Sequence, residues 1–167
     1  MTDIKGVMPD LKFSLTRAND NAPADAHSYR GKVSVLYFGY THCPDVCPTT
    51  LSNLSIALNA LGEDAKKVRV LFVSVDPDRD TIPVLKSYVS AFAPQIDGMR
   101  GTANQVADLA RRYRVAFKVT PATSGRPYEV THSNSIFIFD GAGRARFVTM
   151  SSDNQPALLA ALRNLLN

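Results

Sequence analysis

The sequence is poor in the features that define several protein classes. It contains no tryptophan and only two cysteines among its 167 residues, which excludes a disulfide-rich scaffold, and a chain of this length can fold without a bridge. No apolar run approaches the roughly 18 to 20 residues that span a bilayer, and the first residues, Met1 to Gly6, lack the apolar stretch of a signal peptide. We therefore expect the chain as given to be soluble, and we expect its two cysteines to serve chemistry.

Long runs of one charge are also missing. The formal net charge is +4, and many of the basic residues occur in short groups at 66–69, 111–114 and 144–146. No basic motif with interleaved aromatic residues is present, so the sequence predicts no nucleic-acid partner, while an acidic protein partner stays open. With 45% hydrophobic and 20% charged residues, the composition is that of a globular protein, and residues 1–167 are expected to form one domain.

The first half of the chain alternates buried strands with amphipathic helices. Val33–Gly39 and Val68–Val75 are short apolar runs rich in β-branched residues, which is typical of buried parallel strands. One helix is expected after Pro48, with Gly62 at its end, and a second over Ile82–Phe92. The predicted inward stripes are Leu51, Leu54, Ile56, Leu58 and Leu61 in the first helix, and Val84, Leu85, Tyr88, Val89 and Phe92 in the second. This alternation predicts a right-handed βαβ crossover.

The second half predicts a helix, a hairpin and a closing helix. The expected elements, in chain order, are a helix over Ala103–Tyr113 capped by Thr102, a loop over Thr120–Arg126, a hairpin of Ser135–Asp140 with Ala145–Met150, and a helix over about Pro156–Leu166. The whole order is that of an α/β protein with a thioredoxin-like fold, an N-terminal extension over residues 1–30 and an insertion before the C-terminal β-hairpin.

Both cysteines lie in the segment Gly39–Pro48, between the first predicted strand and its helix. This is the carboxyl end of a strand in an open α/β sheet, where ligands usually bind. Cys43 and Cys47 are four residues apart, so a turn near the helix start would bring their sulfurs together for a disulfide or a shared soft metal. A helix N-terminus also lowers the thiol pKa, which suits both chemistries. Two unreactive buried cysteines, or a purely structural disulfide, are the alternative interpretation.

The kind of metal is predicted from the kind of donor. Two thiolates suit Cu(I), and an added imidazole also suits Cu(II), whereas structural zinc normally takes four protein ligands. Of the three histidines, His27 lies in a polar loop, and His42 adjoins Cys43, where neighbouring side chains on an extended chain point apart. His132 precedes the predicted hairpin, which packs beside the cysteine loop in this fold, so it is the expected third donor. Without the cysteine pair, a lone histidine at this position would be interpreted as structural.

The run Tyr37–Pro48 contains a CxxxCP spacing and resembles the signature of the SCO/SenC family of copper-binding proteins. Two further stretches, Ser74–Thr81 and Thr131–Ser133, match that family. The resemblance covers about Gly31 to Met150, which is most of the chain. Two departures stand out: Asn19–Ser28 is longer and more polar than the compact first segment typical of the family, and the usual N-terminal membrane anchor is missing, which we interpret as a removed segment.

The resemblance implies a site and a role. Cys43, Cys47 and His132 occupy the family's copper-ligand positions, for Cu(I) or Cu(II), and the cysteines also cycle between dithiol and disulfide. The family delivers copper to the dinuclear CuA centre of cytochrome c oxidase subunit II, or reduces the cysteines of that subunit beforehand. The expected location is a membrane facing the bacterial periplasm, with the mitochondrial intermembrane space as the alternative. Another copper chaperone is a candidate donor of the metal.

Three aspartates, Asp76, Asp78 and Asp80, follow the second predicted strand and should lie beside the cysteine loop. For Asp78 and Asp80 the favoured roles are helix capping and turn formation. Asp76 resembles an aspartate that the family keeps near its metal centre, where a carboxylate could accept hydrogen bonds from ligand side chains or complete a Cu(II) shell.

Two functions are compatible with these residues. In a copper metallochaperone, the reduced cysteine pair and His132 hold the ion, which passes to a partner by ligand exchange. In a thiol–disulfide oxidoreductase, one cysteine attacks a partner disulfide and the other resolves the mixed species, without a metal. A peroxidase of the thioredoxin superfamily is disfavoured, because neither cysteine stands in a sequence context typical of peroxide attack.

Overall fold

The computed structural model describes residues 1–43 and 46–166. An eight-stranded sheet with the order β1-β10-β9-β4-β5-β6-β2-β3 forms its centre. β4 (Val33–Gly39), β5 (Val68–Ser74) and β6 (Ile96–Arg100) are mutually parallel, while β9 (Ile136–Phe139) pairs antiparallel with β4 and, across a hairpin, with β10 (Ala145–Thr149). The predicted strands, the βαβ unit and the C-terminal hairpin are therefore confirmed.

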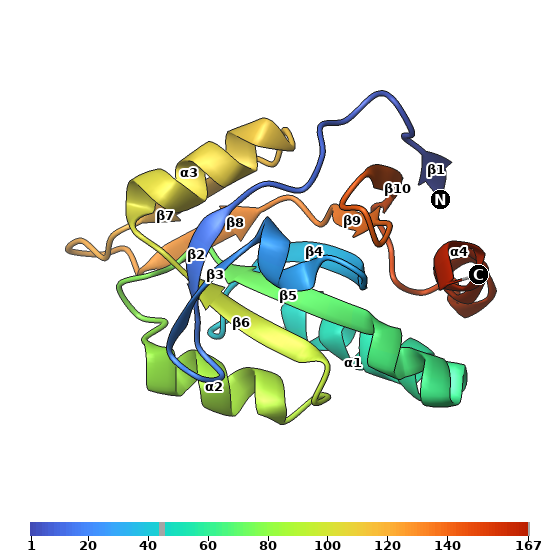
Figure 1. The fold of residues 1–167 in the computed structure, drawn as a ribbon. Coiled ribbons are helices and arrows are strands. Elements are labelled where there is room, and N and C mark those ends of the chain that lie inside the picture. Colours follow the sequence, from blue (N-terminus) through green and yellow to red (C-terminus); the bar gives the residue numbers. More distant parts are fainter. Residues whose placement is uncertain (44–45, 167) are drawn as a thin grey trace.

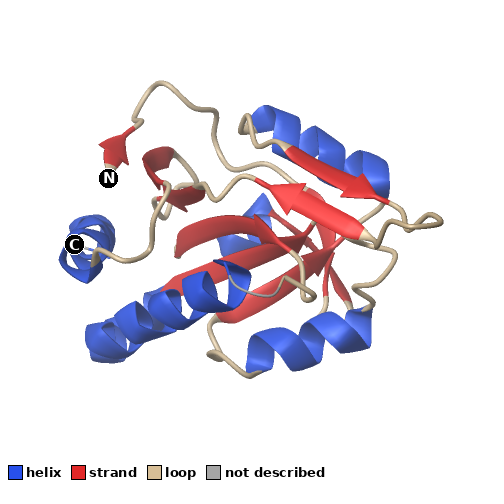
Figure 2. Ribbon diagram, turned by 180° about the vertical axis from the view of Figure 1, so that it is seen from behind, coloured by secondary structure: helices blue, strands red, loops and turns tan. Residues whose placement is uncertain are grey.

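Helices cover both faces of this sheet. α1 (Val46–Leu61) and α2 (Ile82–Ser90) lie on one face and α3 (Ala103–Arg112) on the other, as Figure 1 shows and Figure 2 repeats from behind. α4 (Gln155–Leu166) packs against α1, where the Gln155 side chain donates a hydrogen bond to the carbonyl of Asn53. In the described part of the chain, no helix combines the length and the apolar character that crossing a membrane requires.

Two residues of the predicted helix stripes are not inside. Ile56 is 54% exposed, because it lies two positions from Leu54 and residues two apart point to opposite sides of a helix. Val84 is 38% exposed, because it lies in the first turn of α2 on the rim of a groove beside the cysteine loop. The remaining stripe residues Leu51, Leu54, Leu58, Leu61, Leu85 and Val89 are buried, and Tyr88 and Phe92 are half-buried.

The N-terminal extension adds strands to both edges of the sheet, which the sequence pattern did not predict. β1 (Thr2–Asp3) pairs with β10 at one edge, and β2 (Ser14–Arg17) pairs with β6 and with β3 (Ala22–Asp25) at the other. Two short 3₁₀ helices follow β3 and α1, at Ala26–Tyr29 and Gly62–Lys67.

The insertion before the hairpin is a small sheet of its own. β7 (Phe117–Thr120) pairs antiparallel with β8 (Glu129–His132), so the predicted loop Thr120–Arg126 is the connection that follows β7, closed by a bridge between Thr123 and Arg126. His132, which precedes the hairpin as predicted, is the last residue of a strand of this small sheet and pairs with Phe117.

The sheet register brings two functional loops to one edge. β4 and β5 pair without a register shift along their whole length, and the last pair is Gly39 with Ser74. The loop that carries the cysteines and the loop that carries the three aspartates therefore leave neighbouring strands at the same level. Gly39 is required at this point, because a Cβ atom there would lie 2.8 Å from the Cys47 Sγ and 2.7 Å from the Phe72 ring.

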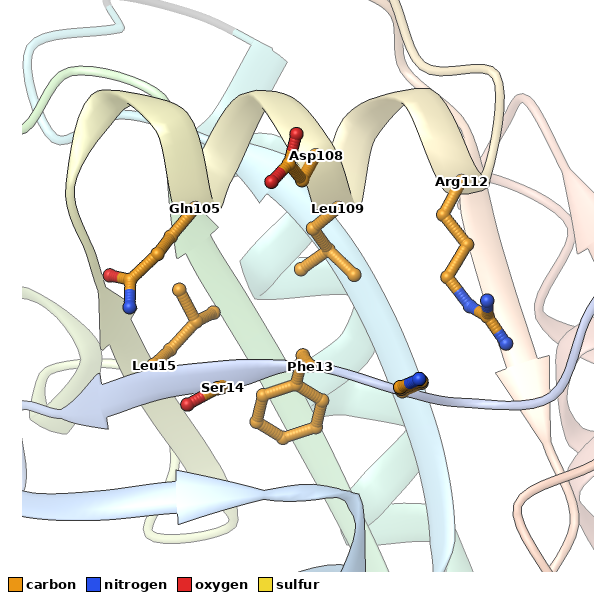
Figure 3. Close-up of a pocket in the computed structure, with 8 residues that line it drawn as sticks. Phe13, Ser14, Leu15, Gln105, Asp108, Leu109 and Arg112 are labelled. Carbon is orange, nitrogen blue, oxygen red and sulfur yellow. The ribbon is translucent and has the colours of Figure 1, made fainter.

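A separate hollow of about 400 Å³ lies between α3 and the segment 12–15 (Figure 3). Gln105, Leu109 and Arg112 project from α3 toward the segment that carries Phe13 and Leu15. The lining contains no thiol and no imidazole, so this hollow offers no donor for a soft metal.

Candidate metal centre

Three side chains from separate segments meet beside the end of β4. One donor atom from each of Cys43, Cys47 and His132 lies within 4.8 Å of the other two. Cys43 comes from the loop after β4, Cys47 from the first turn of α1 and His132 from the end of β8. The structure thus brings together the three residues that the sequence singled out, and no disulfide joins the two cysteines.

Cys47 forms the buried side of this group. Its side chain has 0% exposure, and its Sγ lies 3.3 Å from the His132 Nε2 and 3.7 Å from the Tyr37 hydroxyl. Burial raises the pKa of the Cys47 thiol to about 12, because the low-dielectric surroundings disfavour the thiolate. The expectation that the helix N-terminus lowers the thiol pKa is therefore wrong for Cys47, where desolvation outweighs the helix field.

The helix N-terminus acts on the other cysteine. The Cys47 backbone N–H donates to the Cys43 Sγ at 3.5 Å. This amide belongs to the first turn of α1, where N–H groups have no acceptor within the helix. Cys43 is half-buried, whereas Cys47 is enclosed. Of the two sulfurs, that of Cys43 is thus the one within reach of an approaching partner.

His132 is oriented as a neutral donor. Its Nδ1 lies 2.9 Å from the Ser133 carbonyl oxygen, which can only accept, so Nδ1 carries the proton and Nε2 presents its lone pair toward Cys47. Burial lowers the pKa of His132, an effect that the hydrogen bond to Ser133 partly offsets. The rings of Tyr37 and Tyr40 stand edge-on to the imidazole, at centroid distances of 6.1 and 5.7 Å, and hold its plane.

The donor set fits one class of ion. Two sulfurs and one imidazole nitrogen suit soft copper, whereas structural zinc takes four protein ligands. No fourth His, Cys, Asp or Glu joins this group among the described residues.

Asp76 lies outside the group of three. Its two carboxylate oxygens accept hydrogen bonds from the Arg79 Nε at 2.6 Å and from the Tyr128 hydroxyl at 2.5 Å, and the Arg79 guanidinium stacks 3.9 Å over the Tyr128 ring. Because Tyr128 directly precedes β8, this contact ties the acidic loop to the strand that carries His132. Asp76 instead groups with His42 and Asp80, whereas Asp78 is exposed.

Asp80 has a role that sequence reasoning missed. It does not cap α2, whose N-cap is Thr81; its buried carboxylate accepts from the Thr41 backbone N–H at 3.1 Å, from the Thr41 hydroxyl at 2.6 Å and from the Ser74 hydroxyl at 2.7 Å. These bonds fasten the start of the cysteine loop to β5. The exposed His42 ring lies 3.9 Å from the same carboxylate. The only signal in the sequence was that both loops follow neighbouring strands.

Comparison with protein families gives one match over nearly the whole chain. Residues 7–167 match the family model described as SCO1/SenC. Among curated relatives, the mitochondrial SCO2 homolog of Bos taurus is 36% identical over 147 residues, covering 83% of this chain and 55% of the relative. The mitochondrial SCO2 of Saccharomyces cerevisiae is 41% identical over 135 residues, covering 79% and 44%. The chain thus spans about half the length of these relatives.

Solved structures resemble the fold closely. Bradyrhizobium japonicum ScoI with copper bound is 36% identical, with a TM-score of 0.83 over 93% of this chain and 98% of that one. Yeast Sco1 with copper bound is 31% identical, also with a TM-score of 0.83, over 93% and 88%. The thioredoxin-like architecture predicted from the order of elements agrees with these structures.

Proposed function

Because this chain belongs to the SCO1/SenC family, we propose that it carries copper for the assembly of cytochrome c oxidase, with Cys43, Cys47 and His132 as the ligands. The observation that carries this proposal is the convergence of two thiols and one neutral imidazole within 4.8 Å. The recipient we propose is the CuA centre of oxidase subunit II, and a second copper chaperone is the proposed donor.

Relatives support this assignment. Three solved structures at 30% identity or more are described with copper bound, those of Bradyrhizobium japonicum, Arabidopsis thaliana and yeast. Another, at 17% identity, belongs to a protein described as a member of the Sco family of cytochrome c oxidase assembly proteins. The curated relatives named above are mitochondrial. We place the work of this chain at the periplasmic face of the bacterial inner membrane, with the mitochondrial intermembrane space as the alternative.

The geometry suggests how the ion would be held and released. Cys47 and His132 are fixed by packing, since Cys47 is enclosed and the imidazole is held by Ser133 and two tyrosine rings. Cys43 is the more accessible ligand. An incoming donor from the partner would therefore replace Cys43 first, while the enclosed Cys47 and the oriented His132 keep the ion in place until a second donor arrives.

The same arrangement supports a second function, a thiol–disulfide oxidoreductase. The accessible Cys43, as a thiolate, would attack a partner disulfide, forming a mixed disulfide and releasing one partner thiol. Cys47 would then lose its proton and attack the Cys43 sulfur, which closes a Cys43–Cys47 disulfide and releases the second partner thiol. The contrast between an accessible and a buried cysteine four residues apart favours this sequence of steps.

An anaerobic titration with Cu(I) separates the two functions. We expect the fully reduced chain to bind one copper and to pass it to a reduced, copper-free CuA domain, as followed by the copper counted on each protein after the two are separated. The control mixes metal-free reduced chain with a CuA domain whose cysteines are oxidised. Fast reduction of that domain, together with no tight copper binding, would replace the carrier by the oxidoreductase.

Replacing His132 by alanine should weaken copper binding by at least about tenfold, because it removes the nitrogen donor, and partners that only orient ligands are already worth ten- to a hundredfold. Competition against a chelator of known affinity measures the change, and circular dichroism checks the fold. His27→Ala is the matched control, since His27 is exposed on the short helix after β3 and should leave the affinity unchanged. Equal affinities for His132→Ala and the unmodified chain would remove His132 from the site.

A further inference from the structure

The strand that carries His132 is not part of the main sheet. In the described part of the chain β8 pairs only with β7, and the two strands form a separate small sheet, which Figure 1 shows next to α3. The position of the imidazole relative to the two sulfurs therefore does not follow from the register of β4, β5 and β9. It depends on how side chains hold β8 against the loops of the main sheet.

One face of this strand is turned toward those loops. Side chains two apart in an extended chain point to the same side, so Tyr128, which directly precedes β8, should share a face with Val130 and His132. Val130 is buried, and Tyr128 and His132 are half-buried, whereas the two residues between them are exposed. At one end of this face the His132 Nε2 lies 3.3 Å from the Cys47 Sγ. Tyr128 marks the other end, roughly 13 Å away along the chain.

The Tyr128 hydroxyl holds this far end through a buried carboxylate. It donates to one Asp76 oxygen at 2.5 Å, and the Arg79 Nε donates to the other at 2.6 Å. Asp76 is fully buried, and its charge is compensated by Arg79, whose guanidinium lies 3.9 Å over the Tyr128 ring. Hydrogen bonds to a charged acceptor are about twice as strong as those between neutral groups. Tyr128, Asp76 and Arg79 thus form a closed set of contacts, here called the Tyr128 latch.

The strand has a second attachment, nearer to the metal centre. The buried Tyr40 hydroxyl donates to the Val130 carbonyl at 3.2 Å, and the Tyr40 ring stands edge-on to His132. This bond fixes the middle of the strand, but a single hydrogen bond does not set the direction of a strand. The Tyr128 latch supplies a second point, and two points set the direction in which the strand presents the imidazole.

We propose that Tyr128 is a positioning residue of the metal centre, whose hydrogen bond to Asp76 directs the strand of His132 so that the imidazole meets the two sulfurs. This inference rests on the proposed function. Tyr128 does not bind the ion. The loop that carries Asp76 also carries Asp80, which fastens the start of the cysteine loop through Thr41, so one loop holds both parts of the donor set in place.

Tyr128→Phe tests the inference, because it removes the hydroxyl and keeps the ring under the Arg79 guanidinium. We expect Cu(I) affinity, measured by anaerobic competition against a chelator, to fall by about tenfold. This is the low end of the range for groups that orient metal ligands, since the Tyr40 bond remains. In the His132→Ala background the same substitution should leave the affinity unchanged, because no imidazole is left to direct. A general loss of stability would not produce this difference between the two backgrounds.

Tyr113→Phe is the matched control. The Tyr113 hydroxyl is also hydrogen-bonded, to the carbonyl of Asp10, and neither residue belongs to the metal group. Its removal should lower the unfolding temperature and leave copper affinity unchanged in both backgrounds. A second measurement needs no copper. Nuclear Overhauser contacts between the rings of Tyr40 and His132, whose centroids lie 5.7 Å apart, should weaken in metal-free Tyr128→Phe and persist in Tyr113→Phe.

The outcomes separate this inference from the proposed function. If the unmodified chain binds copper and Tyr128→Phe binds it equally well, only the role of Tyr128 is rejected. An equal loss of affinity with and without His132 also rejects that role, because the hydroxyl would then act through the general stability of the fold. Unchanged contacts between the two rings reject it as well. If the unmodified chain binds no copper, the proposed function and this inference fall together.

Discussion

Replacing Cys47 by serine should abolish stoichiometric Cu(I) binding, with a loss in affinity of more than about a hundredfold, since even partners that only orient ligands are worth ten- to a hundredfold. Cys47 is the enclosed ligand, and its Sγ lies 3.3 Å from the imidazole nitrogen that completes the set. A serine hydroxyl is nearly the same shape, but it is a hard donor and stays protonated, so it cannot replace a thiolate toward a soft ion. Metal counted per chain after desalting measures the loss.

The fold should survive this substitution, which makes the copper result interpretable. The new hydroxyl can donate to the His132 Nε2, so it is not left buried and unpaired. Ala57→Ser is the matched control, because Ala57 is equally buried on α1 and belongs to no metal group, and it should still bind one copper. Retention of one tightly held copper by Cys47→Ser would place the metal elsewhere and refute the proposed site.

The central part of the fold could be predicted because its signals are local. Val33–Gly39 is apolar at nearly every position, and the structure buries all seven residues between two helical layers. Once β4, α1 and β5 are assigned, parallel pairing fixes where the next loops emerge. The hairpin of β9 and β10 could be predicted in the same way, since two runs rich in strand-forming residues flank a glycine-containing turn.

The strands that were missed owe their burial to distant partners. β6 contains Asp97 and Gly98 and does not resemble a core strand, but Asp97 accepts a hydrogen bond from the Tyr29 hydroxyl at 2.7 Å and pairs with Arg69 at 2.6 Å. A pattern of apolar residues cannot reveal that a buried charge is compensated from another segment. The strands of the N-terminal extension are short, and pairing at the sheet edges defines them.

The donor residues of the candidate site could be predicted from the sequence, whereas the surroundings of those residues could not. Spacing and strand order indicated Cys43, Cys47 and His132, and these three do converge. The thiol pKa could not be predicted, because it depends on how much protein covers each sulfur, and Cys47 is covered completely. Asp80, which fastens the start of the cysteine loop to β5, acts through a contact between two loops, and the spacing of residues in the sequence does not reveal such a contact.

The affinity for Cu(I) should rise about a hundredfold between about pH 6.5 and about pH 8.5 from Cys47 alone, because each binding event displaces one proton from this thiol. The pKa of Cys47 is raised to about 12, so the thiol is protonated throughout this range and the affinity gains about tenfold per pH unit. His132 adds no slope, since burial lowers its pKa and keeps the imidazole neutral over the same range.

Competition titrations at several pH values, corrected for protonation of the chelator, measure this slope, and the protons released per copper give an independent count. His132→Ala provides the control, because it should bind more weakly at every pH and keep the same slope. A flat profile would mean that Cys47 is already a thiolate in the metal-free protein. In that case the helix N-terminus would lower the pKa of the Cys47 thiol by more than burial raises it.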